Sequence, residues 1–332
     1  MQEKETELKV ALIGSMPRQE KFGADIDIKG AQLIALPGQI SPEELAEKAG
    51  DAQYVIIDAI GTFTAAHMDA MPHLKLIHSE GVGYNGIDVK AASERGVIVC
   101  NNKGANAAAV AEHTVMMMLA LTRDVLFGHR SVLEGRQIET KSAMMKAGVH
   151  ELSEFKIGLI GFGDIAKEVV RMLKPFGPEV FFTVARQPRA EELATGAKFL
   201  EKDELLRTCD IVSLHLPANP QTAGMVDKAF IDKMKDGAML INTSRGELMV
   251  NADVIDALKS GKLSRAAFDT VAPEPVLKDN EFLNMPEELA DKVLFSPHIA
   301  GVTVNMFRKA YRTIWSNIFR AENGEEPVNR VN

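Results

Sequence analysis

A succession of three kinds of segment recurs along most of the chain: a short apolar run, a polar turn and a segment with helical periodicity. The apolar runs are rich in valine, isoleucine and leucine, which is typical of strands buried on both faces of a parallel sheet. Repeated alternation of strands with helices favours α/β units. At about 150 residues per domain, the 332 residues of the chain suggest two such units.

The first third of the chain predicts one α/β unit with a parallel sheet. Its expected strands are Val10–Ile13, Leu33–Leu36, Tyr54–Ile57, Leu74–His78 and Val97–Cys100. Between the second and third strands, Ser41-Pro42-Glu43-Glu44 is a capping box with proline at the first helical position, and it predicts a helix start.

A second series of elements begins at Lys156 and predicts a doubly wound dinucleotide-binding sheet of six strands. Its expected strands are Ile157–Ile160, Val180–Val184, Ile211–Leu214, Met239–Asn242, Ala266–Phe268 and Val293–Phe295. The expected helices are Ile165–Phe176, Asp227–Lys235 and Ala252–Ser260, with a last helix at about Val304–Ala321 and a long helix, Ala107–Arg123, that joins the two units.

The strongest binding motif follows the first strand of the second series and opens a helix: Gly161-Phe162-Gly163-Asp164-Ile165-Ala166. One glycine allows a tight turn, and the next lets the backbone approach a pyrophosphate at the helix N-terminus, where amides and the helix dipole favour an anion. Alanine is an accepted residue at the third glycine position. In this context the motif predicts a dinucleotide site, and the alternative is a glycine turn that binds nothing.

The end of the following strand indicates which dinucleotide is bound. An acid usually stands there to hold the ribose hydroxyls, but Thr183–Gln187 contains none, and Arg186 and Arg189 are present instead. An arginine can bind the additional phosphate of NADP. We therefore expect NADP(H) to be favoured, with NAD(H) as the alternative, unless both arginines are solvated loop residues.

Three polar segments follow strands of the second series: Asn242-Thr243-Ser244-Arg245-Gly246, Phe268–Pro275 and Ser296–Gly301. Ligands bind at the carboxyl edge of an open α/β sheet. An arginine, a glutamate (Glu274) and a histidine (His298) are thus expected to converge where a nicotinamide ring would lie.

With these segments the chain resembles the D-2-hydroxyacid dehydrogenases, the family of phosphoglycerate dehydrogenase and glyoxylate/hydroxypyruvate reductase. The resemblance covers nearly the whole chain. It includes Glu80–Asp88, the stretch from Gly104 through Thr114 and the motif at Gly161, and the region Thr183–Glu192 is most similar to the NADPH-using glyoxylate/hydroxypyruvate reductases.

The resemblance implies a Rossmann domain inserted into a smaller, flavodoxin-like α/β substrate domain. The substrate domain would comprise residues 1–103 and 300–332, and the NAD(P)-binding domain residues 104–299. The resemblance also implies a homodimer, with residues of about 106–150 at the interface.

The resemblance further implies which residues bind the ligands. The amides of Val82 and Gly83 would hold the substrate carboxylate together with Arg245. The expected cofactor-binding residues are Gly161, Gly163, Asp164, Ile165, Arg186, His215, Pro217, Thr243, Asp269, Ala300 and Gly301.

The chemistry of reducing a 2-keto acid predicts catalytic roles for Arg245, Glu274 and His298, and the resemblance implies the same roles for these residues. The reaction needs a cation for the carboxylate, a hydride donor and a proton for the developing alkoxide. Arg245 can hold a carboxylate bidentately, His298 can donate the proton, and Glu274 would orient the imidazole and favour its charged form. Taken singly, these residues could instead be a strand-end ion pair, a satisfied loop histidine and a turn acid.

Composition and charge restrict the binding partners and the cellular location that we expect. The formal net charge of −8 argues against general electrostatic binding to nucleic acid or to an anionic membrane. No apolar run approaches a membrane span, and the polar N-terminus lacks a signal-peptide pattern. Cys100 and Cys209 stand in no metal-ligand spacing, so a reducing cytoplasm is the simplest location and no metal is expected.

Some alternatives stay open at this stage. A nucleotide-sensing, corepressor-like binding protein could share the fold, and a formate dehydrogenase is a related enzyme. Glu80 precedes the Gly81-Val82-Gly83 turn. If it points inward, it disfavours substrates with a second anionic group, and if it points to solvent it has no such role.

Overall fold

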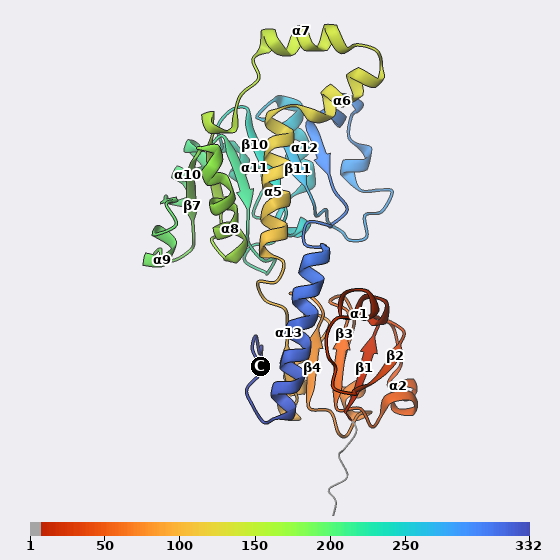
Figure 1. The fold of residues 1–332 in the computed structure, drawn as a ribbon. Helices are drawn as coiled ribbons and strands as arrows, with labels where there is room; N and C mark the ends of the chain where they lie inside the picture. Colours follow the sequence, from red (N-terminus) through yellow and green to blue (C-terminus); the bar gives the residue numbers. More distant parts are fainter. Residues whose placement is uncertain (1–7) are drawn as a thin grey trace, which may run out of the picture. The chain divides into compact units, whose positions relative to one another are not determined.

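The computed structural model describes residues 8–332 of the chain. The chain folds into two compact units, of which the second, Ala107–Gly301, is inserted into the first after Asn106, and the first resumes at Val302. Each unit is built around one parallel sheet (Figure 1). This architecture confirms the predicted α/β class.

The sheet of the first unit has five parallel strands in the order β2-β1-β3-β4-β5. They are β1 (Lys9–Ile13), β2 (Gln32–Leu36), β3 (Tyr54–Ile57), β4 (Leu76–Ser79) and β5 (Ile98–Cys100). All five predicted strands are confirmed: Tyr54–Ile57 has the predicted ends, and the ends of the other four differ by at most two residues.

Helices cover both faces of this sheet. They are α1 (Met16–Phe22), α2 (Pro42–Ala49), α3 (Ala65–Asp69), α4 (Val89–Glu94) and α13 (Val304–Glu322). Successive side chains of β1 alternate between the faces: Val10 and Leu12 join the cluster formed with Tyr311 and Trp315 of α13, whereas Ala11 and Ile13 join the cluster formed with α2, α3 and α4. The predicted cap of α2 is present, because the Ser41 hydroxyl accepts from the Glu44 amide.

The sheet of the second unit has seven parallel strands in the order β12-β11-β10-β9-β6-β7-β8. They are β6 (Lys156–Ile160), β7 (Glu179–Thr183), β8 (Lys198–Phe199), β9 (Ile211–Leu214), β10 (Ala238–Asn242), β11 (Leu263–Phe268) and β12 (Val293–Phe295). The predicted count of six was therefore wrong by one. Strand β8 has only two residues and lies at the edge of the sheet with one residue exposed, so it leaves no apolar run to detect.

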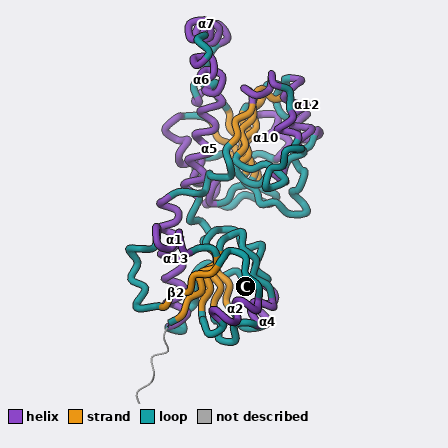
Figure 2. The backbone as a smooth tube through the Cα atoms, turned by 90° about the vertical axis from the view of Figure 1, so that its right-hand side faces the viewer, coloured by secondary structure: helices purple, strands orange, loops and turns teal. Residues whose placement is uncertain are grey.

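Two layers of helices enclose this second sheet (Figure 2). Helices α5 (Ala107–Thr122) and α8 (Asp164–Leu173) pack on one face, and α10 (Lys202–Thr208), α11 (Lys228–Asp232) and α12 (Asn251–Ser260) pack on the other. Helix α8 ends before Pro175, and a short 3₁₀ turn, Lys174–Phe176, completes the segment predicted as one helix.

Three further helices lie outside these two layers. They are α6 (Val125–Leu133), α7 (Gln137–Ala147) and the short α9 (Ala190–Leu193). Helices α6 and α7 project from the α/β body of the second unit (Figure 1). Within residues 8–332, no helix combines the length and the apolar character that a membrane span requires.

Candidate active site

Three neighbouring strands of the second unit end in register. Asn242 of β10 lies beside Phe268 of β11, which lies beside Phe295 of β12. Because the strands are parallel, the loops that follow them leave from the same edge of the sheet. These loops carry Arg245, Asp269, Glu274 and His298, so the fold brings the predicted residues to one edge.

His298 and Glu274 form a hydrogen-bonded pair. The imidazole Nδ1 lies 2.9 Å from each carboxylate oxygen of Glu274. His298 has a φ of 53°, in the left-handed region that few residues other than glycine adopt. Such a backbone persists only where the surrounding structure holds it, and it is common at active sites. The pair leaves Nε2 on the opposite side of the ring, and the His298 side chain is 45% exposed.

The buried carboxylate of Asp269 holds the loop that carries His298. It accepts hydrogen bonds from the Ser296 hydroxyl at 2.5 Å, the Ile299 amide at 3.0 Å and the Ala300 amide at 2.9 Å. The His298 amide donates in turn to the Asp269 carbonyl at 2.8 Å. The aspartate thus fixes the loop on both sides of the histidine.

His113 of helix α5 extends this arrangement. Its Nε2 lies 2.9 Å from the Ser296 hydroxyl, which bonds to Asp269. The sequence did not predict this contact, because residues 113 and 296 are far apart along the chain.

Arg245 presents an exposed guanidinium at the same edge. Within the described chain this group makes no ion pair, and Nη1 donates to the adjacent Ser244 carbonyl at 2.7 Å. The backbone around it is fixed by Asn242, whose amide donates to the Arg245 carbonyl and whose oxygen accepts from the Ser244 amide. An unpaired guanidinium on a fixed backbone suits binding of a carboxylate.

The glycine motif meets the geometric demands of a dinucleotide site. Gly161 has a φ of 92°, and a Cβ at this position would lie 2.3 Å from the His215 carbonyl, so only glycine fits. Gly163 caps helix α8 without a side-chain hydrogen bond, and a Cβ there would meet nothing within 4 Å. The first turn of α8 therefore keeps its amides for an anion such as a pyrophosphate.

His215, at the end of β9, contains an unpaired buried atom. Its Nε2 lies 2.9 Å from the Ser213 hydroxyl, whereas the buried Nδ1 has no hydrogen-bond partner among the described residues. Burial lowers the pKa of His215 to about 4, so the ring is neutral at pH 7. A buried nitrogen without a partner beside Gly161 is consistent with a group that a bound dinucleotide would satisfy.

Arg186 is bound to an acid that sequence reasoning missed. Its guanidinium contacts both carboxylate oxygens of Glu192, at 2.5 and 3.0 Å, and Glu192 is buried. This hydrogen bonding lowers the pKa of Glu192 to about 2. Arg189 donates its amide to Glu192 at 2.8 Å and keeps its side chain exposed. The Glu192 carboxylate accepts from the backbone amide of Arg189 three residues earlier, as a glutamate in the first turn of a helix can, and an acid at this position of the Arg-Ala-Glu-Glu sequence was the signal that could have indicated it.

The other predicted cofactor residues lie on the same strand ends and loops. Thr243 is buried and its hydroxyl bonds to that of Thr114 at 2.8 Å. The Pro217 carbonyl accepts from Thr222 in the loop after β9. Asp164 and Ile165 begin helix α8, and Gly301 follows Ala300 at the end of the unit.

The predicted substrate amides of Val82 and Gly83 lie in the first unit, after β4. Their carbonyls accept hydrogen bonds from Asn101 and Ser79, respectively. Their N–H groups have no partner within residues 8–332. Glu80, which precedes them, is buried and bound to Arg18, so it does not point to solvent.

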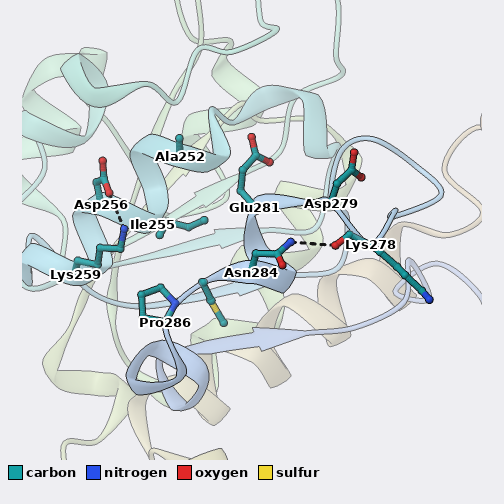
Figure 3. Close-up of a pocket in the computed structure, with 10 residues that line it drawn as sticks. Ala252, Ile255, Asp256, Lys259, Lys278, Asp279, Glu281, Asn284 and Pro286 are labelled. Atoms are coloured by element: carbon teal, nitrogen blue, oxygen red, sulfur yellow. Dashed lines mark hydrogen bonds and ion pairs between the residues drawn. The ribbon is translucent and has the colours of Figure 1, made fainter.

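A surface pocket of about 710 Å³ lies elsewhere on the second unit, between α12 and the segment 278–286 (Figure 3). Charged side chains of both signs surround it, including Lys259, Lys278 and Asp279. None of Arg245, Glu274 and His298 lines it.

The Rossmann sheet and the open N-terminus of α8 are typical of enzymes that bind a nicotinamide dinucleotide. A model of the NAD-binding domain of D-isomer specific 2-hydroxyacid dehydrogenases matches residues 115–300, more than half of the chain. The chain belongs to this family of oxidoreductases, which confirms the resemblance noted in the sequence.

Curated relatives of the chain are named for several activities. A D-3-phosphoglycerate dehydrogenase of Archaeoglobus fulgidus is 33% identical over 85% of this chain and 50% of that protein, so the chain spans half the length of this relative. A formate dehydrogenase of Solanum tuberosum is 32% identical over 84% of this chain and 73% of its own length. A hydroxypyruvate reductase of Blautia hydrogenotrophica is 30% identical over 93% of this chain and 95% of its own length.

Solved structures agree on the fold. The D-lactate dehydrogenase of Lactobacillus jensenii with NAD⁺ superposes with a TM-score of 0.84 at 25% identity, covering 98% of this chain and 100% of that one.

Proposed function

We propose that the protein reduces a short 2-keto acid to the D-2-hydroxy acid with NADPH, as a glyoxylate/hydroxypyruvate-type reductase. The observation that carries this proposal is the unpaired guanidinium of Arg245 on the same sheet edge as the His298–Glu274 pair. Reduction of the keto group of a 2-keto acid requires a cation that binds the substrate carboxylate and, beside it, a proton donor such as a histidine hydrogen-bonded to a carboxylate.

Arg245 binds the substrate carboxylate through paired N–H donors, which orients the keto group. The free amides of Val82 and Gly83 suit the same kind of anion. In this proposal the unit of residues 1–103 and 300–332 binds substrate, and residues 104–299 bind the cofactor.

His298 supplies the proton in reduction. Its Nδ1 is bonded to Glu274, so Nε2 carries the transferable proton and donates it to the carbonyl oxygen as that oxygen gains charge. Glu274 stabilises the imidazolium and fixes the ring orientation. When bound, the dinucleotide would supply a hydride; addition of that hydride to C2 and of the His298 proton to the oxygen converts the C=O group to an H–C–OH group, with the C–O single bond kept. In the reverse direction, His298 accepts the proton.

Gly161, Gly163 and the first turn of α8 would hold the pyrophosphate of the cofactor. We propose NADPH as the preferred form, because Arg186 and Arg189 stand where an acid would repel the additional phosphate. The pair with Glu192 fixes Arg186 but also neutralises part of its charge. The ratio of kcat/KM for NADPH and NADH tests this preference, and a strong preference for NADH contradicts it.

We propose a homodimer that forms through residues of about 106–150. Helices α6 and α7 support this because they carry exposed apolar side chains: Val132, Leu133, Ile138 and Met145 are each more than half exposed. Light scattering after gel filtration should give twice the chain mass, and Leu133→Asp with Met145→Asp should give a monomer. We also propose the cytoplasm as the location, which suits two buried free thiols.

The similarity to formate dehydrogenases favours formate as a second candidate substrate. Formate oxidation releases CO₂ when the C–H hydride leaves, and it needs no proton acceptor. The Glu274–His298 pair would then have no acid–base role, which favours the keto acid.

The proposed function is tested with purified protein and a panel of 2-keto acids, read as NADPH or NADH oxidation at 340 nm. We expect turnover with glyoxylate or hydroxypyruvate and a D-configured product. The formate reaction with NAD⁺ or NADP⁺ is measured in parallel. Binding of the dinucleotide without turnover of any acid would support a nucleotide-sensing protein instead.

A further inference from the structure

Arg18 of helix α1 is held between two carboxylates of the first unit. Its Nη2 lies 2.5 Å from Asp58 Oδ2 and 2.5 Å from Glu80 Oε2, and its Nε lies 2.8 Å from the same oxygen of Glu80. Nη2 also donates to the Gly14 carbonyl at 2.9 Å. The other oxygen of Glu80 accepts from the Tyr311 hydroxyl of α13. We call Arg18, Asp58, Glu80 and Tyr311 the Arg18 cluster.

The Arg18 cluster lies where an open α/β sheet binds ligands. Gly14 follows β1, Asp58 follows β3 and Glu80 follows β4, so all three stand at the carboxyl edge. In the order β2-β1-β3-β4-β5, the chain reverses direction across the sheet between β1 and β3. Ligands bind in the crevice that forms at such a reversal. The loop of Val82 and Gly83 adjoins this edge, because a Cβ at Gly81 would lie 2.7 Å from the Cβ of Ala59.

Arg18 is rigid but keeps donors for a ligand. Its Nε and Nη2 are occupied, whereas Nη1 makes no hydrogen bond to any of residues 8–332. The Arg18 side chain is 30% exposed and that of Asp58 is 27% exposed. Two N–H groups on a fixed guanidinium can therefore bind an oxygen atom of a ligand at this edge of the sheet.

The charge of the cluster is not positive despite the arginine. Two carboxylates surround one guanidinium, which gives a net charge of −1 when both are ionised. Burial raises the pKa of Glu80, although hydrogen bonds from Arg18 and Tyr311 act in the opposite direction. Even with Glu80 protonated, Asp58 balances Arg18. A second anionic group on a ligand would thus meet no excess of positive charge, and Asp58 would repel it.

We propose that Arg18, held by Asp58 and Glu80, is a specificity-determining residue for the keto acid side chain. This inference rests on the proposed 2-keto acid reductase activity. Nη1 donates hydrogen bonds to an uncharged oxygen beyond C2, such as a hydroxyl group on C3. Asp58 and Glu80 exclude substrates in which a carboxylate or a phosphate stands at that place. The preferred substrate is a monoanionic, hydroxylated short 2-keto acid.

The test compares kcat/KM for hydroxypyruvate, pyruvate and 3-phosphohydroxypyruvate. In the unaltered protein, kcat/KM for hydroxypyruvate should exceed that for the phosphorylated acid by at least about tenfold, because the carboxylates of Asp58 and Glu80 repel the phosphate group. Equal kcat/KM values for the two would overturn the proposal without any variant.

Variants distinguish a role of the Arg18 cluster in substrate specificity from a purely structural role. Asp58→Asn with Glu80→Gln removes two negative charges and keeps the shape, so the ratio of phosphorylated to free hydroxypyruvate should rise about tenfold or more. Arg18→Met should lower the ratio of hydroxypyruvate to pyruvate by about tenfold. The matched control, Asp69→Asn, breaks the Arg95–Asp69 pair of the same unit and should change neither ratio.

A purely structural cluster would lower all three kcat/KM values together and leave the ratios unchanged, which would overturn the proposal. Thermal unfolding shows whether each variant is folded. If a variant is not folded, the ratio of kcat/KM for hydroxypyruvate to that for 3-phosphohydroxypyruvate in the unaltered protein tests the proposal. Absence of turnover with every 2-keto acid would instead refute the proposed function, so the two failures are distinguishable.

Discussion

Substitution of Asp269 is the most direct test of how the fold holds the loop that carries His298. In Asp269→Asn one carboxylate oxygen becomes an NH₂ group. The carboxylate accepts from the Ser296 hydroxyl and from two backbone amides, Ile299 and Ala300. The asparagine retains one acceptor and directs a donor at the remaining N–H group, so one buried donor loses its partner.

The expected cost follows from these contacts. An unsatisfied buried group and weaker hydrogen bonds to a neutral acceptor together destabilise the unit by about 2–4 kcal/mol. For a domain of this size, each kcal/mol lowers Tm by about 2–4 °C, so Tm should fall by roughly 4–16 °C. His298 would also move relative to its substrate, and a displacement of about 1 Å can lower kcat/KM about a hundredfold.

The assay combines thermal unfolding by circular dichroism, kcat/KM with hydroxypyruvate and NADPH binding by calorimetry. The control is Asp232→Asn, because Asp232 forms an exposed pair with Lys228 on α11 and such pairs contribute little. The reasoning is refuted if Asp269→Asn keeps the Tm and the kcat/KM of the unaltered protein. A loss of NADPH affinity at constant Tm would instead place the aspartate against the nicotinamide amide.

Three more predictions concern the site. His298→Ala and Arg245→Ala should each lower kcat/KM at least about a hundredfold in steady-state assays, and full activity of the Arg245 variant would remove the carboxylate anchor. Gly161→Ala places a Cβ 2.3 Å from the His215 carbonyl, so calorimetry should detect no NADPH binding, whereas Gly128→Ala, with nothing within 4 Å of its Cβ, should bind normally. Glu192 has a folded-state pKa of about 2 against an ordinary 4.5, so its stabilisation is present above pH 4.5 and is lost as the pH falls toward 2. Chemical unfolding should therefore show that, between pH 4.5 and 2, the free energy of unfolding falls more steeply in the unaltered protein than in Glu192→Gln. An equal pH dependence of this free energy in the two proteins would contradict the prediction.

Local patterns in the sequence were sufficient to predict most of the fold. Valine- and isoleucine-rich runs such as Tyr54–Ile57 form strands because both faces of a parallel sheet are buried. Strand β8 lacked that signal because it is a two-residue edge strand. The residues at strand ends could be placed near one another because parallel strands share a carboxyl edge.

Contacts between distant side chains could not be predicted in the same way. The pairing of Arg18 with Glu80 joins positions 62 residues apart, and the contact of His113 with Ser296 joins positions 183 residues apart. No periodic pattern encodes such contacts, since they depend on how helices pack on the sheets. Sequence reasoning therefore identified Glu80 but could not determine whether it faced solvent or the interior.

The central claim is that, in the reduction of a 2-keto acid, Arg245 binds the carboxylate and His298, hydrogen-bonded to Glu274, donates the proton. The most direct measurement is NADPH oxidation at 340 nm with hydroxypyruvate, for the unaltered protein and for His298→Ala, with the configuration of the glycerate determined. We predict D-glycerate and a loss of at least about a hundredfold in kcat/KM for the variant. Turnover that survives the substitution, or no oxidation of NADPH or NADH with any 2-keto acid, would contradict the claim.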